Sequence, residues 1–185
     1  VTIAEGIAVK EPGELTTPIL QDLMSGVTVV PENLIERCVQ LFLERQRIVT
    51  EGSGAVPFAA LMQDQERFRG RRVGLVISGG NIDSRILSSI LMRGLVREGR
   101  MAKLRISLID VPGTLSKIAG IIGTKGGNIV EVYHQRLFRD VPVKEAEVDI
   151  VIETLDAEHV RVIMTALVAA GFGVRLLSDT SLDRE

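Results

Sequence analysis

The order of strand and helix patterns after residue 101 constrains the fold of this chain most. The segment KLRISLID (residues 103–110) alternates apolar and polar side chains, as a strand with one buried face does. Further patterns follow in the order helix 114–127, strand 128–138, strand 143–155, helix 156–171 and strand 173–177. This βαββαβ order is the split βαβ arrangement of ferredoxin-like folds, with two helices on one face of a four-stranded antiparallel sheet. The charges of VKEAEVD (143–149) alternate with core positions, so we expect them to face solvent.

The first hundred residues carry a different pattern, in which short apolar strands alternate with helices. Strands are expected over 27–30 and 71–78, and a strand and loop over 1–9, with helices over 17–26, 31–42, 51–65 and 83–98. Such alternation is typical of an α/β domain, whose parallel strands are covered by helices. The polar joint VREGRMAK (96–103) separates the two patterns. We therefore expect an α/β domain over 1–100 and an α+β domain over 101–185.

Composition excludes several classes of function. Lys plus Arg number 22 against 24 Asp plus Glu, and aromatic residues are 3% of the chain, so neither a basic face nor stacking rings for nucleic acid are expected. No apolar run approaches the roughly 18 residues of a membrane span. Cys38 is the only cysteine and there are two histidines, so we expect no disulfide and no metal site, as suits the cytoplasm. The chain does not begin with Met, which suggests a piece of a longer protein.

A Gly-rich turn joins the expected strand over 71–78 to the helix that follows it. Its sequence, SGGN (78–81), allows positive φ and leaves free amides at the start of the helix. It contains neither GxGxxG nor the Lys-Ser/Thr of a P-loop. By itself the turn has two interpretations, a structural bend or a ligand site.

Three segments of the first half together resemble one family of enzymes. They are TIAEGIAVKEPGELT (2–16), IVTEGSGAVPFAAL (48–61) and GLVISGGNID (74–83). In order and spacing they are similar to the C-terminal part of the catalytic domain of threonine dehydratases (threonine ammonia-lyases), which use pyridoxal phosphate. Serine racemase has similar motifs. The resemblance implies a partial fold-type-II pyridoxal-phosphate domain over residues 1–100.

The resemblance also assigns roles to residues of this half. Ser78 would lie against the pyridine nitrogen, and a hydroxyl there leaves that nitrogen nearly neutral, which suits β-elimination. Gly6 and Glu51 would line the cofactor pocket, although Glu51 can also be read as a carboxylate that interacts with the free amides at the start of a helix. The Schiff-base lysine and the phosphate loop of the family have no counterpart, since Lys10 is the only lysine before residue 100 and lacks the family's context. We therefore expect no catalytic residue here and no activity from the chain alone.

The second half resembles an ACT domain, a regulatory module that binds small molecules. The resemblance rests on DVPGT (110–114) and GGNI (126–129) within ISLIDVPGTLSKIAGIIGTKGGNIVEV (106–132). It implies an amino-acid effector site, in which Asp110 holds an ammonium, Gly113 shapes a turn that suits a carboxylate, and Asn128 hydrogen-bonds the ligand. It also implies pairing of ACT domains into a homo-oligomer. The alternative is that the loop only turns and the domain only dimerises.

These resemblances predict part of a cytoplasmic threonine dehydratase, whose substrate is an amino acid. The parent enzyme would convert L-threonine to 2-oxobutanoate and ammonia, with a branched-chain amino acid or threonine as effector. One alternative is a stand-alone binding or dimerisation module, which the missing lysine favours. Another is a serine dehydratase or racemase, which shares the motifs of the first half.

Overall fold

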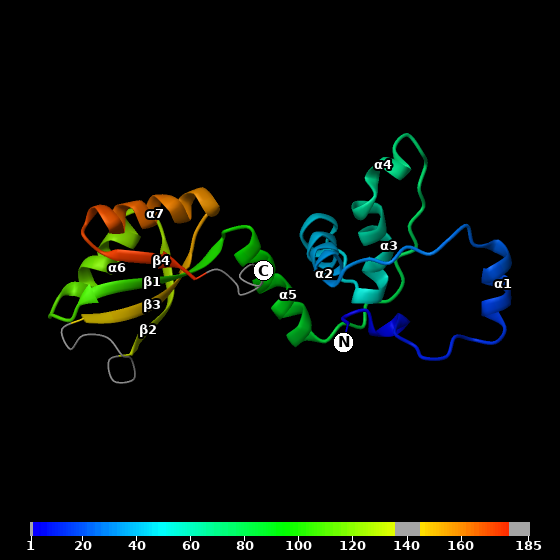
Figure 1. The fold of residues 1–185 in the computed structure, drawn as a ribbon, viewed down its shortest axis with the longest axis horizontal. Coiled ribbons are helices and arrows are strands. Elements are labelled where there is room, and N and C mark those ends of the chain that lie inside the picture. Colours follow the sequence, from blue (N-terminus) through cyan, green and yellow to red (C-terminus); the bar gives the residue numbers. More distant parts are fainter. Residues whose placement is uncertain (1, 136–144, 178–185) are drawn as a thin grey trace. The chain divides into compact units, whose positions relative to one another are not determined.

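The structure is a computed structural model and describes residues 2–135 and 145–177. It divides into two compact units, Val1–Leu91 and Met92–Glu185. Helix α5 (Ser84–Arg97) spans the division (Figure 1). The domain boundary that the sequence places at about residue 100 stays a prediction.

The described part of the first unit is built from helices and connecting segments. They are the 3-10 turn η1 (Glu5–Ile7), α1 (Thr16–Leu23), α2 (Glu32–Leu41), the π-helical turn η2 (Phe42–Gln46), α3 (Gly52–Gln63), α4 (Gln65–Phe68) and the start of α5. The predicted helix over 83–98 is confirmed within one residue at each end. It begins after Asp83, whose carboxylate accepts hydrogen bonds from the amides of Arg85 at 2.8 Å and Ile86 at 3.2 Å.

The strands predicted for the first hundred residues do not form in the described part of this unit. Residues 2–9, 27–30 and 71–78 have no strand assignment. A strand exists only where its backbone groups bond a neighbouring strand, and none lies beside these segments. Their β-branched side chains are left in solvent, with Val27 80%, Val29 83% and Val76 77% exposed.

The core of the first unit lies between α2 and α3. Cys38 and Val39 on α2 and Ala55 and Ala59 on α3 are at most 1% exposed. The ring of Phe42 meets that of Phe58 with the centroids 5.1 Å apart. The apolar side chains of α2 recur at three- and four-residue spacing, which places them on one buried face of the helix.

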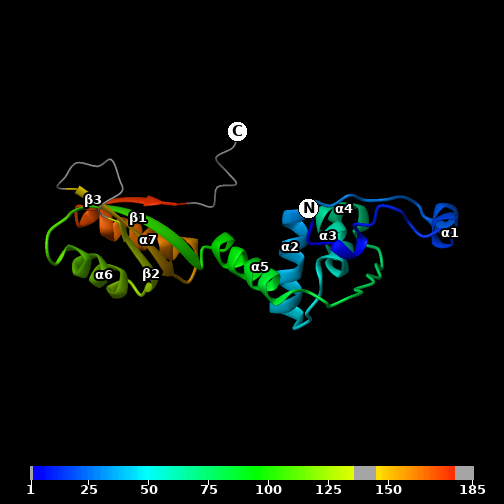
Figure 2. The ribbon, with the colours of Figure 1, turned by 90° about the horizontal axis from the view of Figure 1, so that it is seen from below.

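The second unit has the predicted βαββαβ order. Its elements are β1 (Met101–Ile109), α6 (Thr114–Thr124), β2 (Asn128–Gln135), β3 (Glu145–Glu153), α7 (Ala157–Ala169) and β4 (Gly173–Leu176). The strands lie in the order β2-β3-β1-β4, and each neighbouring pair is antiparallel. The helices α6 and α7 cover one face of this sheet (Figure 2).

The alternation of the strands sets which face is buried. The core face of β1 carries Leu104, Ile106 and Leu108, as predicted. The predicted core positions of β3 are also buried, and they are Ala146, Val148, Ile150 and Ile152. Helix α7 begins after Asp156, whose carboxylate accepts from the amide of His159 at 2.8 Å.

Candidate functional site

Three turns that are far apart in the sequence meet around the side chain of Glu51. Gly6 lies in η1, Glu51 directly precedes α3, and Gly79 lies in the turn before α5. A methyl group built on Gly79 would lie 2.5 Å from Glu51 Oε1, and one built on Gly6 would lie 3.1 Å from the same atom. The structure thus brings together the three motifs that the sequence assigned to one site.

Glycines on the first turn of α3 let the other two turns approach the helix closely. A methyl group on Gly52 would lie 2.2 Å from the carbonyl oxygen of Ile3, and one on Gly54 would lie 2.4 Å from that of Ser78. Since real Cβ atoms do not approach other atoms this closely, only glycine fits at either position. The two glycines of EGSG are therefore required by the close approach of the Ile3 and Ser78 carbonyls to the helix.

The turn at 78–81 is held through its own backbone. The carbonyl oxygen of Gly79 accepts from the Glu51 amide at 3.3 Å and lies 3.2 Å from the hydroxyl of the fully buried Thr50. Gly79 has φ +84°, which an L side chain rarely adopts. Within the described part of the chain Ser78 is an exposed residue, and its hydroxyl makes no hydrogen bond.

Glu51 does not interact with the free amides of α3 in the way the alternative interpretation expected. Its side chain makes no capping hydrogen bond, although Glu51 is the residue directly before the helix. Its Oε1 instead accepts from the Ser53 hydroxyl at 2.5 Å. Sequence reasoning missed Ser53, and the signal available was its position two residues after Glu51 within the same motif.

The residues predicted to bind an effector are not gathered in one place. Asp110 and Gly113 lie in the turn from β1 to α6, where Gly113 has φ +89°. Asn128 begins β2, pairs with Glu153 and donates to its carboxylate at 3.2 Å. Glu153 also pairs with Met101, the first residue of β1. Within one chain Asp110 and Asn128 are therefore at opposite ends of the sheet, about 30 Å apart along a nine-residue strand.

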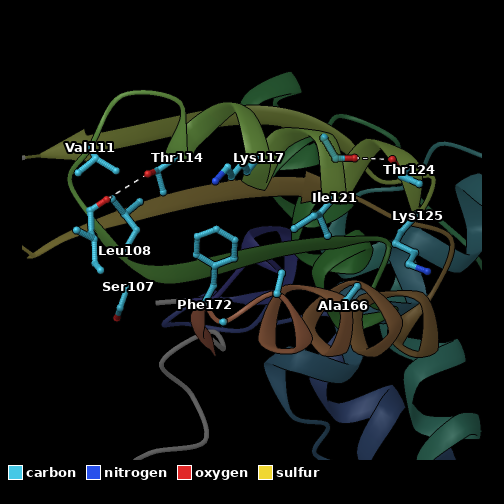
Figure 3. A pocket seen from close by; sticks show the side chains of 14 residues that line it. Ser107, Leu108, Val111, Thr114, Lys117, Ile121, Thr124, Lys125, Ala166 and Phe172 are labelled. Carbon is cyan, nitrogen blue, oxygen red and sulfur yellow. Dashed lines mark hydrogen bonds between the residues drawn. The ribbon is translucent and has the colours of Figure 1, made fainter.

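A groove of about 1090 Å3 lies between α6 and α7 near the C-terminal end of β1 (Figure 3). Its lining is largely apolar, with Ile121 and Phe172 inside, and its charged lining residues are Lys117 and Lys125. Such a lining suits an apolar group that carries negative charge. None of the predicted effector residues lines it. The groove could not be predicted from the sequence, because it depends on the distance between α6 and α7. Tertiary packing sets that distance, and the local sequence of either helix does not.

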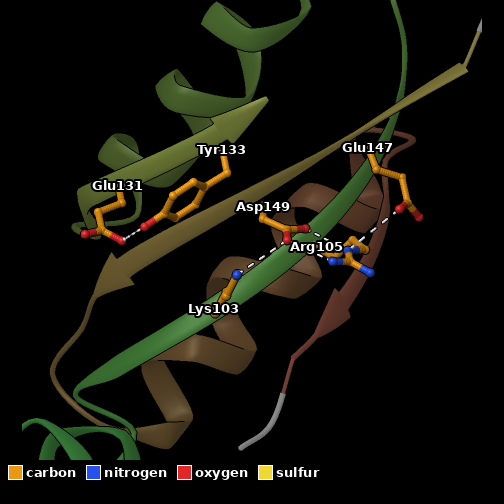
Figure 4. A network of polar contacts seen from close by, with 6 residues as sticks. All are labelled: Lys103, Arg105, Glu131, Tyr133, Glu147 and Asp149. Atoms are coloured by element: carbon orange, nitrogen blue, oxygen red, sulfur yellow. Dashed lines mark hydrogen bonds and ion pairs between the residues drawn. The ribbon is translucent and has the colours of Figure 1, made fainter. Parts of the chain in front are cut away.

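The face of the sheet opposite the helices carries a network of charges centred on Asp149 (Figure 4). Arg105 donates to both carboxylate oxygens, at 2.7 and 2.8 Å, and Lys103 Nζ lies 3.5 Å from Oδ2. Asp149 is only 8% exposed, so the prediction that VKEAEVD faces solvent is wrong at this residue. The hydrogen bond to Asp149 raises the pKa of Arg105 above its ordinary value.

The only tyrosine and one of the two histidines lie on β2. Tyr133 donates to Glu131, which raises the pKa of the phenol, and the Lys103 ammonium lies 5.1 Å from the centre of its ring. His134 is partly buried, and its Nε2 has no hydrogen-bond partner among the described residues.

The described residues contain no cluster of three or more side chains suited to a metal ion. No helix in the described ranges has the length and apolar character needed to cross a membrane.

Comparison with known proteins shows what the chain is similar to. Residues 1–79 match the family model described as pyridoxal-phosphate dependent enzyme. Over 176 residues, 95% of this chain, it is 37% identical to an L-threonine ammonia-lyase of Thermotoga maritima, of which it covers 44%. An L-threonine ammonia-lyase of Geobacter sulfurreducens is 40% identical over 96% of this chain and 44% of its own length. The chain thus spans less than half of these relatives.

A solved structure of a T.th. threonine deaminase is 31% identical over 45% of this chain and 30% of its own, with a TM-score of 0.39.

Proposed function

We propose that the chain is the C-terminal part of a threonine dehydratase, since residues 1–79 match the family model described as pyridoxal-phosphate dependent enzyme. The observation that carries this proposal is the meeting of the three motif turns at Glu51. The names of the two relatives that match nearly the whole chain support threonine as substrate over serine. The parent protein would deaminate L-threonine to 2-oxobutanoate and ammonia in the cytoplasm.

The residues of the first unit fit one side of a site for the cofactor. When bound, pyridoxal phosphate supplies an electron-withdrawing ring that allows an amino acid to lose its α-proton and then its β-hydroxyl. Ser78, exposed beside the constrained Gly79, would donate a hydrogen bond to the ring nitrogen. Gly6 and Glu51 would border the same pocket. The lysine that binds the cofactor would come from outside these 185 residues, so the chain alone would be inactive.

The test uses the full-length protein and the 185-residue chain in parallel. With threonine the full-length protein should form 2-oxobutanoate, with a higher kcat/KM than for serine. Ser78→Ala should lower kcat/KM by about tenfold or more, the effect of losing one good hydrogen bond. The matched control is Ser89→Ala, whose hydroxyl bonds only the Arg85 carbonyl of its own helix at 2.9 Å.

Borohydride separates the two proteins further. It should fix pyridoxal phosphate to a single lysine of the full-length protein, outside this chain, and to no single lysine of the 185-residue chain. Absence of 2-oxobutanoate formation would refute the enzyme proposal, and trapping at Lys10 would refute the inactivity of the chain alone.

For the second unit we propose an ACT-like regulatory domain that pairs with a second copy and binds an amino-acid effector. Its βαββαβ order and the turn at Gly113 support this. Because Asp110 and Asn128 lie at opposite ends of one sheet, a ligand that touches both needs them from two subunits. Calorimetric titration with valine, isoleucine and threonine tests the effector, and sedimentation tests the pairing. If the Asp110→Ala variant binds the effector as tightly as the unmodified protein does, Asp110 is not part of the effector site.

A further inference from the structure

We propose that Ser53 is a positioning residue, whose hydroxyl holds the Glu51 carboxylate between the Gly6 turn and the Gly79 turn. The proposal rests on the proposed function in one respect, since the turn it orients is the one that carries Ser78. Its geometric basis lies within the first unit and does not depend on the cofactor.

The Ser53 hydroxyl competes with backbone amides for this carboxylate. A carboxylate directly before a helix ordinarily accepts from the amides of the first turn. Here Glu51 makes no such bond, and its Oε1 lies 2.5 Å from Ser53 Oγ. A hydroxyl that donates to a carboxylate at this distance forms a charge-assisted hydrogen bond, about twice as strong as a neutral one. The carboxylate is therefore held by the Ser53 hydroxyl and not by the amides of the first turn.

Once fixed, the Glu51–Ser53 pair fills the space that side chains at positions 6 and 79 would need. A methyl group on Gly6 would lie 2.7 Å from Ser53 Oγ and 3.1 Å from Glu51 Oε1. One on Gly79 would lie 2.5 Å from Glu51 Oε1 and 2.6 Å from Cδ. The pair therefore accounts for the glycine at position 6 and adds to the positive φ that already favours glycine at position 79.

The consequence for the site is that this side-chain pair adds a contact to the backbone contacts that join the three turns. The Ser53 hydroxyl orients Glu51, Glu51 packs on Gly79, and Gly79 adjoins Ser78, the residue proposed to meet the ring nitrogen. Loss of the hydroxyl frees the carboxylate to move towards the helix amides and leaves the turn at 78–81 less constrained.

The first measurement is a double-mutant cycle of thermal unfolding on the full-length protein without cofactor. Gly6→Ala should lower Tm by about 2 °C, because the new methyl group meets Ser53 Oγ. In the Ser53→Ala background the same change should cost clearly less, because the nearest atom is gone. Ala is the best helix former, so Ser53→Ala should not itself harm α3. Additive effects of the two changes would overturn the proposal.

The second measurement follows pyridoxal-phosphate affinity by the fluorescence of the bound cofactor. Ser53→Ala should weaken binding by about tenfold, the equivalent of one charge-assisted hydrogen bond, and Ser53→Thr should restore it. Ser89→Ala is the control and should bind as the unmodified protein does. If Ser53 only fills space, Ser53→Thr should not restore the affinity for pyridoxal phosphate that Ser53→Ala loses. If the unfolding cycle shows that Gly6→Ala and Ser53→Ala are coupled but the full-length protein does not bind pyridoxal phosphate, the proposed function is refuted. The role proposed for Ser53 would then still stand.

Discussion

Replacing Asp149 with Asn should destabilise the second unit by about 2 to 3 kcal/mol. Asp149 is 8% exposed and accepts two hydrogen bonds from Arg105, at 2.7 and 2.8 Å. Each charge-assisted bond of this kind contributes about 1.5 to 3 kcal/mol, and an amide can accept only one of them. The amide also points an N–H group at the guanidinium and leaves Lys103 without its 3.5 Å contact. Arg105 keeps about a fifth of its side chain in water, which limits the loss.

The assay uses the single tyrosine of a chain that has no tryptophan. Tyr133 lies on β2, so its intrinsic fluorescence during urea unfolding reports the second unit alone. The matched control is Glu147→Gln, because Glu147 Oε2 lies 3.7 Å from Arg105 Nε, beyond hydrogen-bond distance. We expect the control to cost less than about 0.5 kcal/mol. If Asp149→Asn costs no more than Glu147→Gln, the buried ion pair does not stabilise the sheet and the reasoning is wrong.

Three further predictions concern buried or constrained positions. Burial raises the pKa of the Cys38 thiol to about 11 against the opposing effect of Arg37. In the unfolded chain the thiol has a pKa of about 9, so the free energy of unfolding should fall as pH rises from 9 to 11. Alkylation of Cys38 at pH 8 should also be much slower in the folded protein than in urea. Equal alkylation rates would contradict this prediction. Gly99→Ala should cost about 2 kcal/mol or more, because φ is +68° and a methyl group would lie 2.4 Å from the Ala157 nitrogen; an unchanged urea midpoint would show that the turn shifts freely. Ile150→Ala should cost about 2 to 5 kcal/mol by Tyr133 fluorescence, since Ile150 is fully buried between the sheet and its helices; a loss below about 1 kcal/mol would mean that the core closes over the gap.

The fold of the second unit could be predicted because the apolar pattern within each strand or helix indicates which of its faces is buried. Leu104, Ile106 and Leu108 alternate with Lys103 and Arg105, and this period determines which face of β1 is buried whatever strand lies beside it. The start of α7 followed from Asp156, whose hydrogen bond is local. In the first unit the same reasoning predicted strands that do not form. Val27 and Val29 favour extended backbone, but their presence does not show whether a neighbouring strand is there to pair with.

The candidate site was only partly predictable. The order and spacing of three motifs indicated a shared site, and the structure places Gly6 and Gly79 each beside the Glu51 side chain. Their roles towards the cofactor stay predictions. The role of Ser53 and the burial of Asp149 were missed, since both depend on which side chain is nearest in space.

By itself, then, the sequence determined the periodicities, the turns and the glycines, because these depend on residues within a few positions of one another. Only the tertiary structure decided which turns meet, which carboxylates are buried, and that Asp110 and Asn128 are separated by the length of the sheet. The physical reason is that a hydrogen bond or a close contact depends on distances of a few tenths of an ångström between atoms whose residues are tens of positions apart, and packing sets those distances.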